Sequence, residues 1–236
     1  MKAVILAGGK GTRLAPYTYI LPKPLMPVDH MPILEVVLRQ MKAAGVTDIT
    51  LTVGHLAGLL KTFFQDGSQW GLNICYSYEE KPLGTAGPLA LVEGLDDTFM
   101  VTNGDVLTDL DFRELIGFHK NIGAAATIAS HQRQVRIDYG VLKMNGGNQV
   151  AGYDEKPVIE YLVSMGVYVF EPAVLAYIPR GQYLDFPDLV LKLISAGEKV
   201  AAYPFGGYWM DLGRPDDYMQ ANQDFDEMKS RFLCED

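Results

Sequence analysis

The first 120 residues alternate between short apolar runs and amphipathic segments, and this alternation limits the fold more than any other feature of the sequence. The run Val4–Leu6 contains no polar residue and is soon followed by two glycines, which is typical of a strand buried on both faces. From Ile33 to Met41 the apolar residues recur at helical spacing instead, with Pro32 before them and Gly45 after them. Repeated units of this kind predict a parallel sheet with right-handed crossovers.

The same alternation predicts the other elements of the chain. In the first half we expect strands at 49–53, 72–78 and 98–102, and helices at 57–64, 86–95 and 111–120. In the more mixed second half we expect a hairpin of 139–144 and 150–154, a strand at 161–170, a helix at 185–196, a strand at 200–204 and a helix at 215–229. No linker or internal repeat interrupts the sequence. We therefore expect one α/β domain over residues 1–236, with a mixed, mainly parallel central sheet.

Composition and charge exclude several classes of protein. Hydrophobic residues make up 48% of the chain and charged residues 21%, which rules out disordered, collagenous and coiled-coil proteins. The net charge of −9 argues against a general affinity for nucleic acid or anionic membranes. No apolar run approaches the roughly 20 residues of a membrane span, and the N-terminal run is too short for a signal peptide. Two cysteines, Cys75 and Cys234, are too few for a disulfide framework, so we expect reduced thiols and a cytoplasmic location.

Two loops follow strongly apolar strands and are the best candidates for a ligand site. They span residues 7–14 and 102–105, and open α/β sheets bind ligands beyond the carboxyl ends of their strands. Glycines in the first loop allow backbone N–H groups to approach an anion, and Lys10 and Arg13 add positive charge. Lys23 lies between two prolines that restrict its backbone. These features favour phosphate binding over the alternative of a solvated basic face.

Neither of two common phosphate-binding motifs accounts for the first loop. The sequence has no Gly-x-x-x-x-Gly-Lys-Ser/Thr, and the segment 9–14 lacks the third glycine of a dinucleotide fingerprint. A P-loop NTPase and a nicotinamide-dependent oxidoreductase are therefore disfavoured. The four histidines show no metal spacing and no serine has a Gly-x-Ser-x-Gly context, so a zinc enzyme and a serine hydrolase are disfavoured as well.

Two aspartates stand out among the carboxylates. Asp105 follows Gly104 at the end of a predicted strand, and Asp211 lies in the apolar, glycine-containing segment 208–213. Two carboxylates together with phosphate oxygens and waters form an octahedral Mg²⁺ site. A role in a turn or a helix cap is the alternative for each of them. The residues alone thus offer Asp105 and Asp211 as a candidate pair of Mg²⁺ ligands.

Seven short segments resemble, in the same order, the motifs of the sugar-1-phosphate nucleotidyltransferases, and together they span nearly the whole chain. They are Ala7-Gly8-Gly9-Lys10-Gly11-Thr12-Arg13-Leu14, Pro22-Lys23-Pro24-Leu25, Pro82-Leu83-Gly84-Thr85-Ala86-Gly87-Pro88-Leu89, Asn103-Gly104-Asp105, Tyr139-Gly140-Val141, Glu155-Lys156-Pro157 and Trp209-Met210-Asp211-Leu212-Gly213. The resemblance implies a single α/β/α nucleotide-binding (Rossmann-like) domain, without the C-terminal β-helix domain of longer relatives. It also implies a reaction in which a nucleoside triphosphate and a sugar-1-phosphate give an NDP-sugar and pyrophosphate.

The resemblance further assigns roles to individual residues. Arg13 would hold the β- and γ-phosphates, Lys23 would lie near the transferred phosphoryl group, and Asp105 would act with them in catalysis. Asp105 and Asp211 would bind Mg²⁺. The implied nucleotide-binding residues are Leu6, Ala7, Gly8, Gly9, Gly11, Thr12, Arg13, Glu80, Gly84, Thr85 and Gly104. The implied sugar-phosphate-binding residues are Gly140, Glu155, Lys156 and Gly166.

Within that family the segment 78–87 is most similar to the mannose-1-phosphate guanylyltransferases. A carboxylate only accepts hydrogen bonds, and guanine presents adjacent N1–H and N2–H donors, so Glu80, or failing that Glu79, would favour GTP. The segment Val163–Tyr168 departs from the Asn-Ala-Gly pattern of that branch, so the sugar is left as mannose or a heptose. UTP, dTTP or CTP with another sugar-1-phosphate is an alternative, and so is a non-catalytic subunit that senses nucleotide-sugars. Homo-oligomers are usual in the family, and no nucleic-acid or membrane partner is expected.

Overall fold

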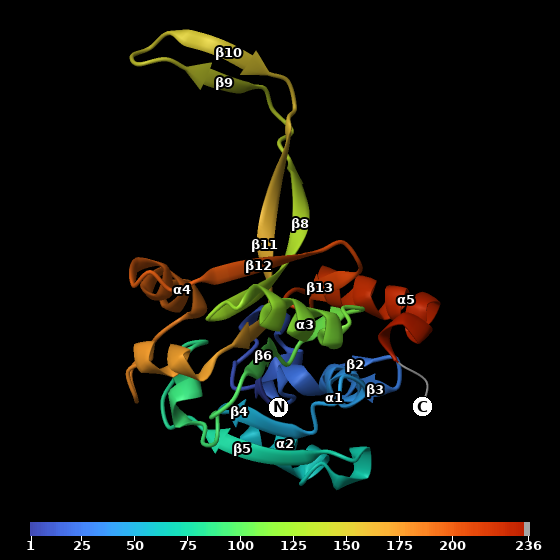
Figure 1. Cartoon of the computed structure of the whole chain (residues 1–236). Helices are drawn as coiled ribbons and strands as arrows, with labels where there is room; N and C mark the ends of the chain where they lie inside the picture. The colour runs from blue at the N-terminus through green and yellow to red at the C-terminus, as the bar shows by residue number, and fades with distance from the viewer. Residues whose placement is uncertain (234–236) are drawn as a thin grey trace.

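The computed structural model describes residues 1–233 and has a seven-stranded central sheet (Figure 1). The strands lie in the order β12-β8-β11-β6-β1-β4-β5. β11 is antiparallel to both of its neighbours, and every other adjacent pair in this sheet is parallel. The mixed, mainly parallel sheet expected from the sequence is thus confirmed. The strands are β1 (Lys2–Leu6), β4 (Asp48–Val53), β5 (Asn73–Tyr78), β6 (Phe99–Asn103), β8 (Ala126–Arg136), β11 (Val158–Phe170) and β12 (Val200–Phe205).

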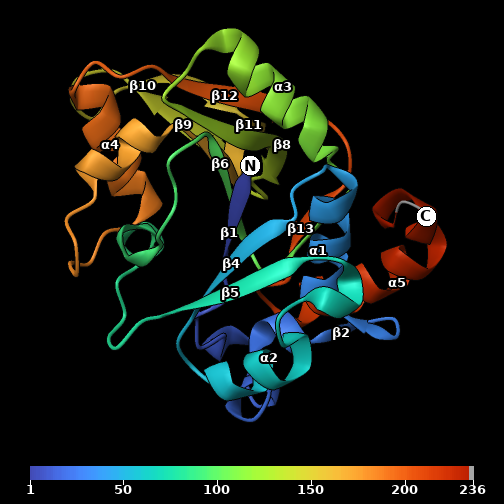
Figure 2. The same ribbon diagram turned by 60° about the horizontal axis from the view of Figure 1, so that its bottom comes forward.

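Helices cover both faces of this sheet, which gives the expected α/β/α order of layers. Successive residues of a strand point to opposite faces, so Ala3 and Ile5 of β1 join the core beneath α1, while Val4 joins the core beneath α4. The apolar run is unbroken because both faces of β1 are covered. α1 (Ile33–Ala43), α2 (Ala57–Phe64) and α3 (Phe112–Ile122) pack on one face, and α4 (Phe186–Ser195) packs on the other (Figure 2).

Local signals set the ends of two of these helices. Pro32 immediately precedes α1, and Gly45 just beyond its end has a left-handed φ of 75°. The Asp111 carboxylate accepts a hydrogen bond of 2.8 Å from Arg113 N and caps the start of α3. Both helices therefore lie close to where the sequence pattern places them.

Two differences from the expected elements bear on the site. The segment 86–95 forms only a short 3₁₀ turn, η5 (Gly87–Leu91), so the helix predicted there is wrong. The first N–H groups of this segment donate to the Leu184 carbonyl, and Pro88 has no N–H to continue a helical ladder. The sequence patterns also missed two small antiparallel sheets, because strands of two or three residues show no periodicity. These sheets are β2 (Pro27–Val28) with β3 (Met31–Pro32), and β7 (Val106–Thr108) with β13 (Trp209–Asp211).

The C-terminal helix α5 (Pro215–Phe232) forms a third apolar core, separate from the two beside the central sheet. The rings of Phe225 and Phe232 stack there with their centroids 5.4 Å apart. Val28 of β2 and Leu107 of β7 are buried in the same core. α5 therefore packs on the small sheets and not on the central one.

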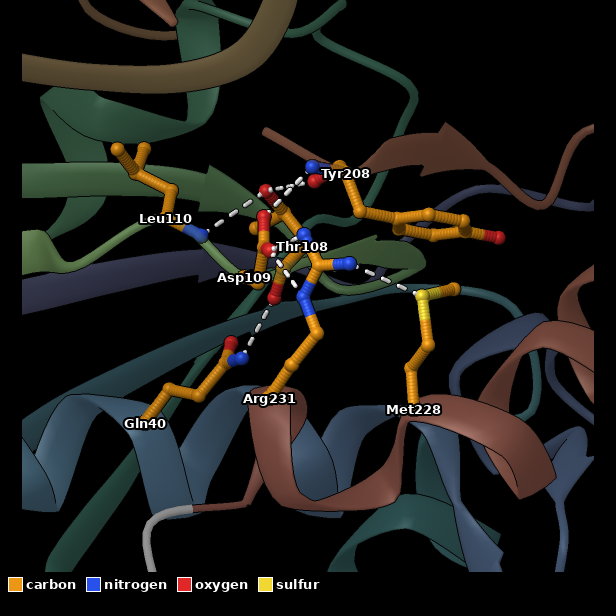
Figure 3. A network of polar contacts seen from close by, with 7 residues as sticks. All are labelled: Gln40, Thr108, Asp109, Leu110, Tyr208, Met228 and Arg231. Carbon is orange, nitrogen blue, oxygen red and sulfur yellow. Dashed lines mark hydrogen bonds and ion pairs between the residues drawn. The ribbon is translucent and has the colours of Figure 1, made fainter. Parts of the chain in front are cut away.

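Polar contacts at the end of α5 attach the β7–β13 sheet to the rest of the molecule (Figure 3). Arg231 Nε donates to Asp109 Oδ2 at 2.9 Å, and Asp109 Oδ1 accepts from Tyr208 N at 2.6 Å. From the other side, Gln40 Nε2 of α1 donates to the Thr108 carbonyl at 2.7 Å. The segments on either side of this small sheet are thus held by side chains from both α1 and α5.

β8 and β11 continue beyond the sheet as an arm that projects from the body (Figure 1). Residues 130–136 and 158–164 form an unbroken antiparallel ladder, and the register of the two strands shifts only after Ser164. The outer end of the arm is a hairpin of β9 (Val141–Met144) and β10 (Val150–Asp154), which pairs with no other strand of residues 1–233. The hairpin expected from the turn-rich link is thus confirmed. We call residues 130–164 the arm and the rest of the molecule the body.

Two further expectations concern the cysteines and the lack of a membrane-spanning helix. Cys75 is an exposed free thiol, whereas Cys234 lies outside the described residues. Within residues 1–233, none of the helices combines the length and the apolar composition that a membrane span requires.

Candidate active site

A cavity of about 830 Å³ opens at the carboxyl ends of β1, β4 and β6. Both loops that the sequence singled out line it, as the strand-end rule predicts. Gly104 lies just behind the wall, where its N–H donates to the Leu6 carbonyl at 2.9 Å. The residues assigned to the nucleotide that line the cavity are Leu6, Ala7, Gly8, Gly9, Gly11, Thr12, Arg13, Glu80, Gly84 and Thr85, and Lys10, Lys23 and Asp105 line it with them.

The glycine-rich loop after β1 is shaped by close contacts of its backbone. A side chain at Gly8 would lie only 2.8 Å from Glu79 Oε1, which shows how closely the Glu79 carboxylate approaches this loop. Gly11 has a φ of 60° and leads into the 3₁₀ turn Thr12–Leu14. That turn carries Arg13 at the edge of the cavity. The loop therefore combines exposed backbone with a cation, which is the combination that an anion site needs.

Lys23 connects two carboxylates that lie far apart in the sequence. Its ammonium forms ion pairs with Asp105 Oδ2 and with Asp211 Oδ1, the latter at 3.3 Å. Lys23 is buried and starts the 3₁₀ turn Lys23–Leu25, directly after a proline. In the antiparallel pairing of β13 with β7, Asp211 lies opposite Val106. Val106 is the residue that directly follows Asp105. This pairing brings the two aspartates to the same point.

The charges of this cluster influence one another. Burial raises the pKa of the Asp105 carboxyl above its ordinary value; the Lys23 ammonium opposes this rise and Asp211 adds to it. A side chain at Gly213 would lie 3.1 Å from both Arg13 Nη2 and Asp211 Oδ2, which places the Arg13 guanidinium beside this cluster. Two cations and two carboxylates thus meet at one side of the cavity.

The two aspartates fit a divalent cation of the kind expected. Mg²⁺ prefers oxygen ligands and is usually held by one or two carboxylates together with substrate phosphates and waters. Asp105 and Asp211 supply two carboxylates at one point, since both contact the same ammonium nitrogen. Within residues 1–233 no group of three or more histidine, cysteine, aspartate or glutamate side chains could hold a metal. A metal at this point would therefore take its remaining ligands from bound phosphates and water.

The two glutamates after β5 are placed differently. The Glu79 carboxylate lies against the glycine-rich loop and accepts a hydrogen bond of 3.0 Å from Leu83 N. Burial raises the pKa of Glu79 above its ordinary value, although the Leu83 N–H opposes the rise. Glu80 also lines the cavity, but it is exposed. The sequence pattern favoured Glu80 and offered Glu79 second; both line the cavity, and Glu79 is the one whose carboxylate lies against the glycine-rich loop.

Asp185 is a site residue that the sequence patterns did not identify. Its Oδ1 accepts hydrogen bonds from Thr85 N at 2.9 Å and from Thr85 Oγ1 at 3.2 Å. Its Oδ2 accepts from the Tyr183 hydroxyl at 2.6 Å. Asp185 directly precedes α4, so in the sequence it looks like an ordinary N-cap. Its partner Thr85 is 100 residues away, and no local pattern reveals such a contact.

The four residues assigned to the sugar phosphate are not all near the cavity. Gly166 adjoins it, because a side chain there would collide with Asn103, which lines the cavity. Gly140 lies between β8 and β9, and Glu155 and Lys156 lie between β10 and β11. These three residues are therefore in the outer part of the arm, away from the cavity of their own chain (Figure 1).

Comparisons with known proteins are consistent with a nucleotide site. Residues 2–228 match the family model described as nucleotidyl transferase. The UTP–glucose-1-phosphate uridylyltransferase of Synechocystis sp. is 37% identical, over 94% of this chain and 62% of its own length. The mannose-1-phosphate guanyltransferase of Yarrowia lipolytica is 38% identical, over 93% of this chain and 62% of its own length. This chain thus spans about 62% of the length of these curated relatives.

Solved structures share the fold. A Bacillus anthracis structure, provisionally named a glucose-1-phosphate thymidylyltransferase and solved in complex with a sucrose, has a TM-score of 0.77 at 26% identity, with 94% of both chains covered. HddC from Yersinia pseudotuberculosis has a TM-score of 0.73 at 24% identity, with 95% of this chain and 99% of that chain covered, and supports the fold alone. The family model covers nearly the whole chain, and curated relatives exceed 30% identity over most of it. This chain belongs to the nucleotidyl transferase family.

Proposed function

We propose that the protein transfers a nucleotidyl group from a nucleoside triphosphate to a sugar-1-phosphate and releases pyrophosphate. The observation that carries this proposal is that Arg13, Lys23 and Asp105 line one cavity together with a glycine-rich loop, and that Asp211 forms an ion pair with Lys23. Two polyanionic substrates can react only where their charges are neutralised and their positions are fixed. The names of the curated relatives support the same reaction class.

The chain's own residues have separate tasks in this reaction. The glycine-rich loop and Arg13 bind the triphosphate, and Arg13 stabilises the pyrophosphate as it leaves. Lys23 binds the α-phosphate, because it is the buried cation at the cavity wall. A phosphate oxygen of the sugar-1-phosphate attacks the α-phosphorus in line, and the bond between the α-phosphorus and the bridging oxygen to the β-phosphate breaks. The attacking oxygen is already anionic, so no general base is required.

Asp105 and Asp211 would hold Mg²⁺ in this proposal. The bound ion would neutralise charge on the phosphate oxygens of the two substrates. The pairing of β7 with β13 orients both carboxylates before any substrate arrives, so little rearrangement is needed.

GTP is the nucleotide that the site favours. The Glu79 carboxylate faces the glycine-rich loop and can accept hydrogen bonds from N1–H and N2–H of guanine. Two of the relatives named above differ in their nucleotide, so UTP is the main competing substrate. Mannose-1-phosphate and a heptose-1-phosphate are the proposed sugar substrates. A cytoplasmic location, expected from the sequence, is part of the same proposal.

Pyrophosphate release tests the proposal directly. The protein with Mg²⁺ is given GTP, UTP, dTTP, CTP or ATP, each crossed with mannose-, glucose-, N-acetylglucosamine- and heptose-1-phosphate. We expect release with GTP and a mannose or heptose phosphate. Release only with UTP would retain the reaction and change the base assignment. Tight nucleotide binding without release in any combination would favour the non-catalytic sensing subunit.

A further inference from the structure

The arm carries an unusual share of the exposed apolar side chains. Of the twenty large hydrophobic side chains that are exposed in residues 1–233, nine lie in the arm, each at least 44% exposed. Apolar surface concentrated in one segment marks an interaction site. The nine are Val135, Tyr139, Leu142, Met144, Val150, Tyr153, Val158, Tyr161 and Leu162.

The exposed apolar area of the arm is similar to the area that one partner buries in a stable dimer. Nine side chains that each leave about 100 Å² uncovered expose roughly 900 Å² over the two faces of the arm, and a stable interface buries about 800 Å² on each partner. An isolated two-stranded hairpin is only marginally stable in water. The β9–β10 hairpin pairs with no other strand of the described residues. The arm therefore needs a covering surface that its own chain does not supply.

The arm holds its outer end away from the cavity of its own chain in this structure (Figure 1). Its ladder is unbroken, and the register of its two strands shifts only after Ser164, where the arm joins the body. Gly166, at this joint, adjoins the cavity wall. Lys156 is eight residues farther out than Ser164, which corresponds to about 25 Å along a strand.

The outer part of the arm carries a group of polar residues that contact one another. The Tyr153 hydroxyl donates to Glu155 Oε2 at 3.2 Å, and a side chain at Gly140 would collide with the Tyr153 ring. Lys156, next to Glu155, is exposed and has a left-handed φ of 46°. It takes part in none of the ion pairs within residues 1–233. A cation in a strained conformation, without a partner in the described chain, is suited to an anionic ligand.

The body exposes apolar side chains in a segment whose two ends are at the cavity. Tyr17, Tyr19 and Ile20 are exposed in the segment between Arg13 and Lys23, the two cavity-lining cations. The apolar side chains of an arm from another copy would cover this segment. The polar end of that arm would then lie at the cavity mouth.

We propose that two copies of the chain exchange arms, so that Glu155 and Lys156 of one copy bind the sugar phosphate at the cavity of the other. The inference rests on the proposed function, because the sugar phosphate is the anion that Lys156 binds. A two-fold axis relates the two exchanged arms, and both copies are completed in the same way. Each active site is then formed by the body of one chain and the arm of its partner.

A mixed dimer of two inactive variants tests the shared site. Arg13→Ala removes a cation of the cavity, and Lys156→Ala removes the cation of the arm; both positions are exposed, so both variants should fold. Co-expression with two different affinity tags and tandem purification isolates the mixed dimer. One of its two sites combines an intact body with an intact arm. We expect about half of the wild-type turnover, whereas each variant alone is lower by about 100-fold.

The matched control combines Arg13→Ala with Asp211→Asn, two substitutions in the body. Both sites of this mixed dimer are defective, so turnover should stay at the level of the single variants. If the Arg13→Ala and Lys156→Ala dimer shows no recovery either, the inference is overturned and Lys156 acts within its own chain.

Association in solution provides a readout that does not need activity. Sedimentation at micromolar concentration should show a wild-type dimer and a monomer after the double change Leu142→Ser and Leu162→Ser. Leu191→Ser on α4, which removes an equally exposed leucine of the body, should leave the dimer intact. A monomeric wild type overturns the inference. If the proposed function fails but the inference holds, the wild type forms a dimer and releases no pyrophosphate with any substrate pair. This result differs from the monomeric wild type that would overturn the inference.

Discussion

The body and the arm share the strand β11, but its two ends lie in opposite environments. Val167, Val169 and Phe170 are fully buried between two helical layers. Tyr161 and Leu162, a few residues earlier, are at least half exposed. The same kind of side chain therefore stabilises the body by packing but leaves the arm dependent on another surface. The comparison shows that the burial of an apolar strand depends on which elements cover it and not on its composition alone.

The largest expected effect is on activity, in the charge cluster of the body. Asp211→Asn removes one carboxylate from contact with Lys23 and one proposed Mg²⁺ ligand, so turnover should fall by about 100-fold or more. Pyrophosphate release at saturating substrate concentrations measures this. Asp96→Asn, in an exposed loop of the same body, is the matched control and should leave turnover unchanged. Near-normal turnover of Asp211→Asn would remove this residue from the catalytic cluster.

The free energy of unfolding should respond differently to substitutions in the body and in the arm. Leu51→Ala, at a fully buried position of β4, should lower the free energy of unfolding by about 2–5 kcal/mol, because it leaves a cavity in the core. Leu162→Ala on the arm should cost less than about 0.5 kcal/mol in the monomer. Urea denaturation below the concentration at which copies associate measures both. Equal losses would contradict the difference between the two regions.

Nucleotide choice should depend on one glutamate of the body. Glu79→Gln replaces an acceptor-only carboxylate by an amide beside the glycine-rich loop, so the preference for GTP over UTP should fall by about 10-fold. The ratio of kcat/KM for the two nucleotides measures this preference. Glu80→Gln is the control, because Glu80 is exposed and should change the ratio little. The reverse result would restore Glu80 as the base-reading residue.

The smallest effect should come from a buried hydroxyl in the body. Thr52 Oγ1 has no hydrogen-bond partner in the described structure, so Thr52→Val should leave the free energy of unfolding unchanged or raise it by at most about 1 kcal/mol. Thr127→Val is the matched control, because Thr127 Oγ1 is 2.7 Å from His119 Nδ1. That substitution should lower stability by about 1–2 kcal/mol. Thermal or urea unfolding distinguishes the two.

The glycine-rich part of the cavity was largely predictable. Gly8, Gly11 and Arg13 lie in one loop after one apolar strand, so strand prediction and the strand-end rule located them together. The choice between Glu79 and Glu80 was not predictable, because it depends on which of two adjacent side chains faces that loop. A shift of one residue in the register of a strand exchanges the side chains on its two faces, and this would reverse the choice between the two glutamates.

By itself, the sequence determined most of the succession of strands and helices, the mainly parallel sheet and the loops at its carboxyl edge. These features follow from interactions between residues a few positions apart, which leave a periodic pattern. Only the tertiary structure decided that Asp105 and Asp211 share Lys23, that Asp185 holds Thr85, and that the arm stays uncovered. Such contacts depend on the register and packing of distant segments, and these are settled collectively when the whole chain folds.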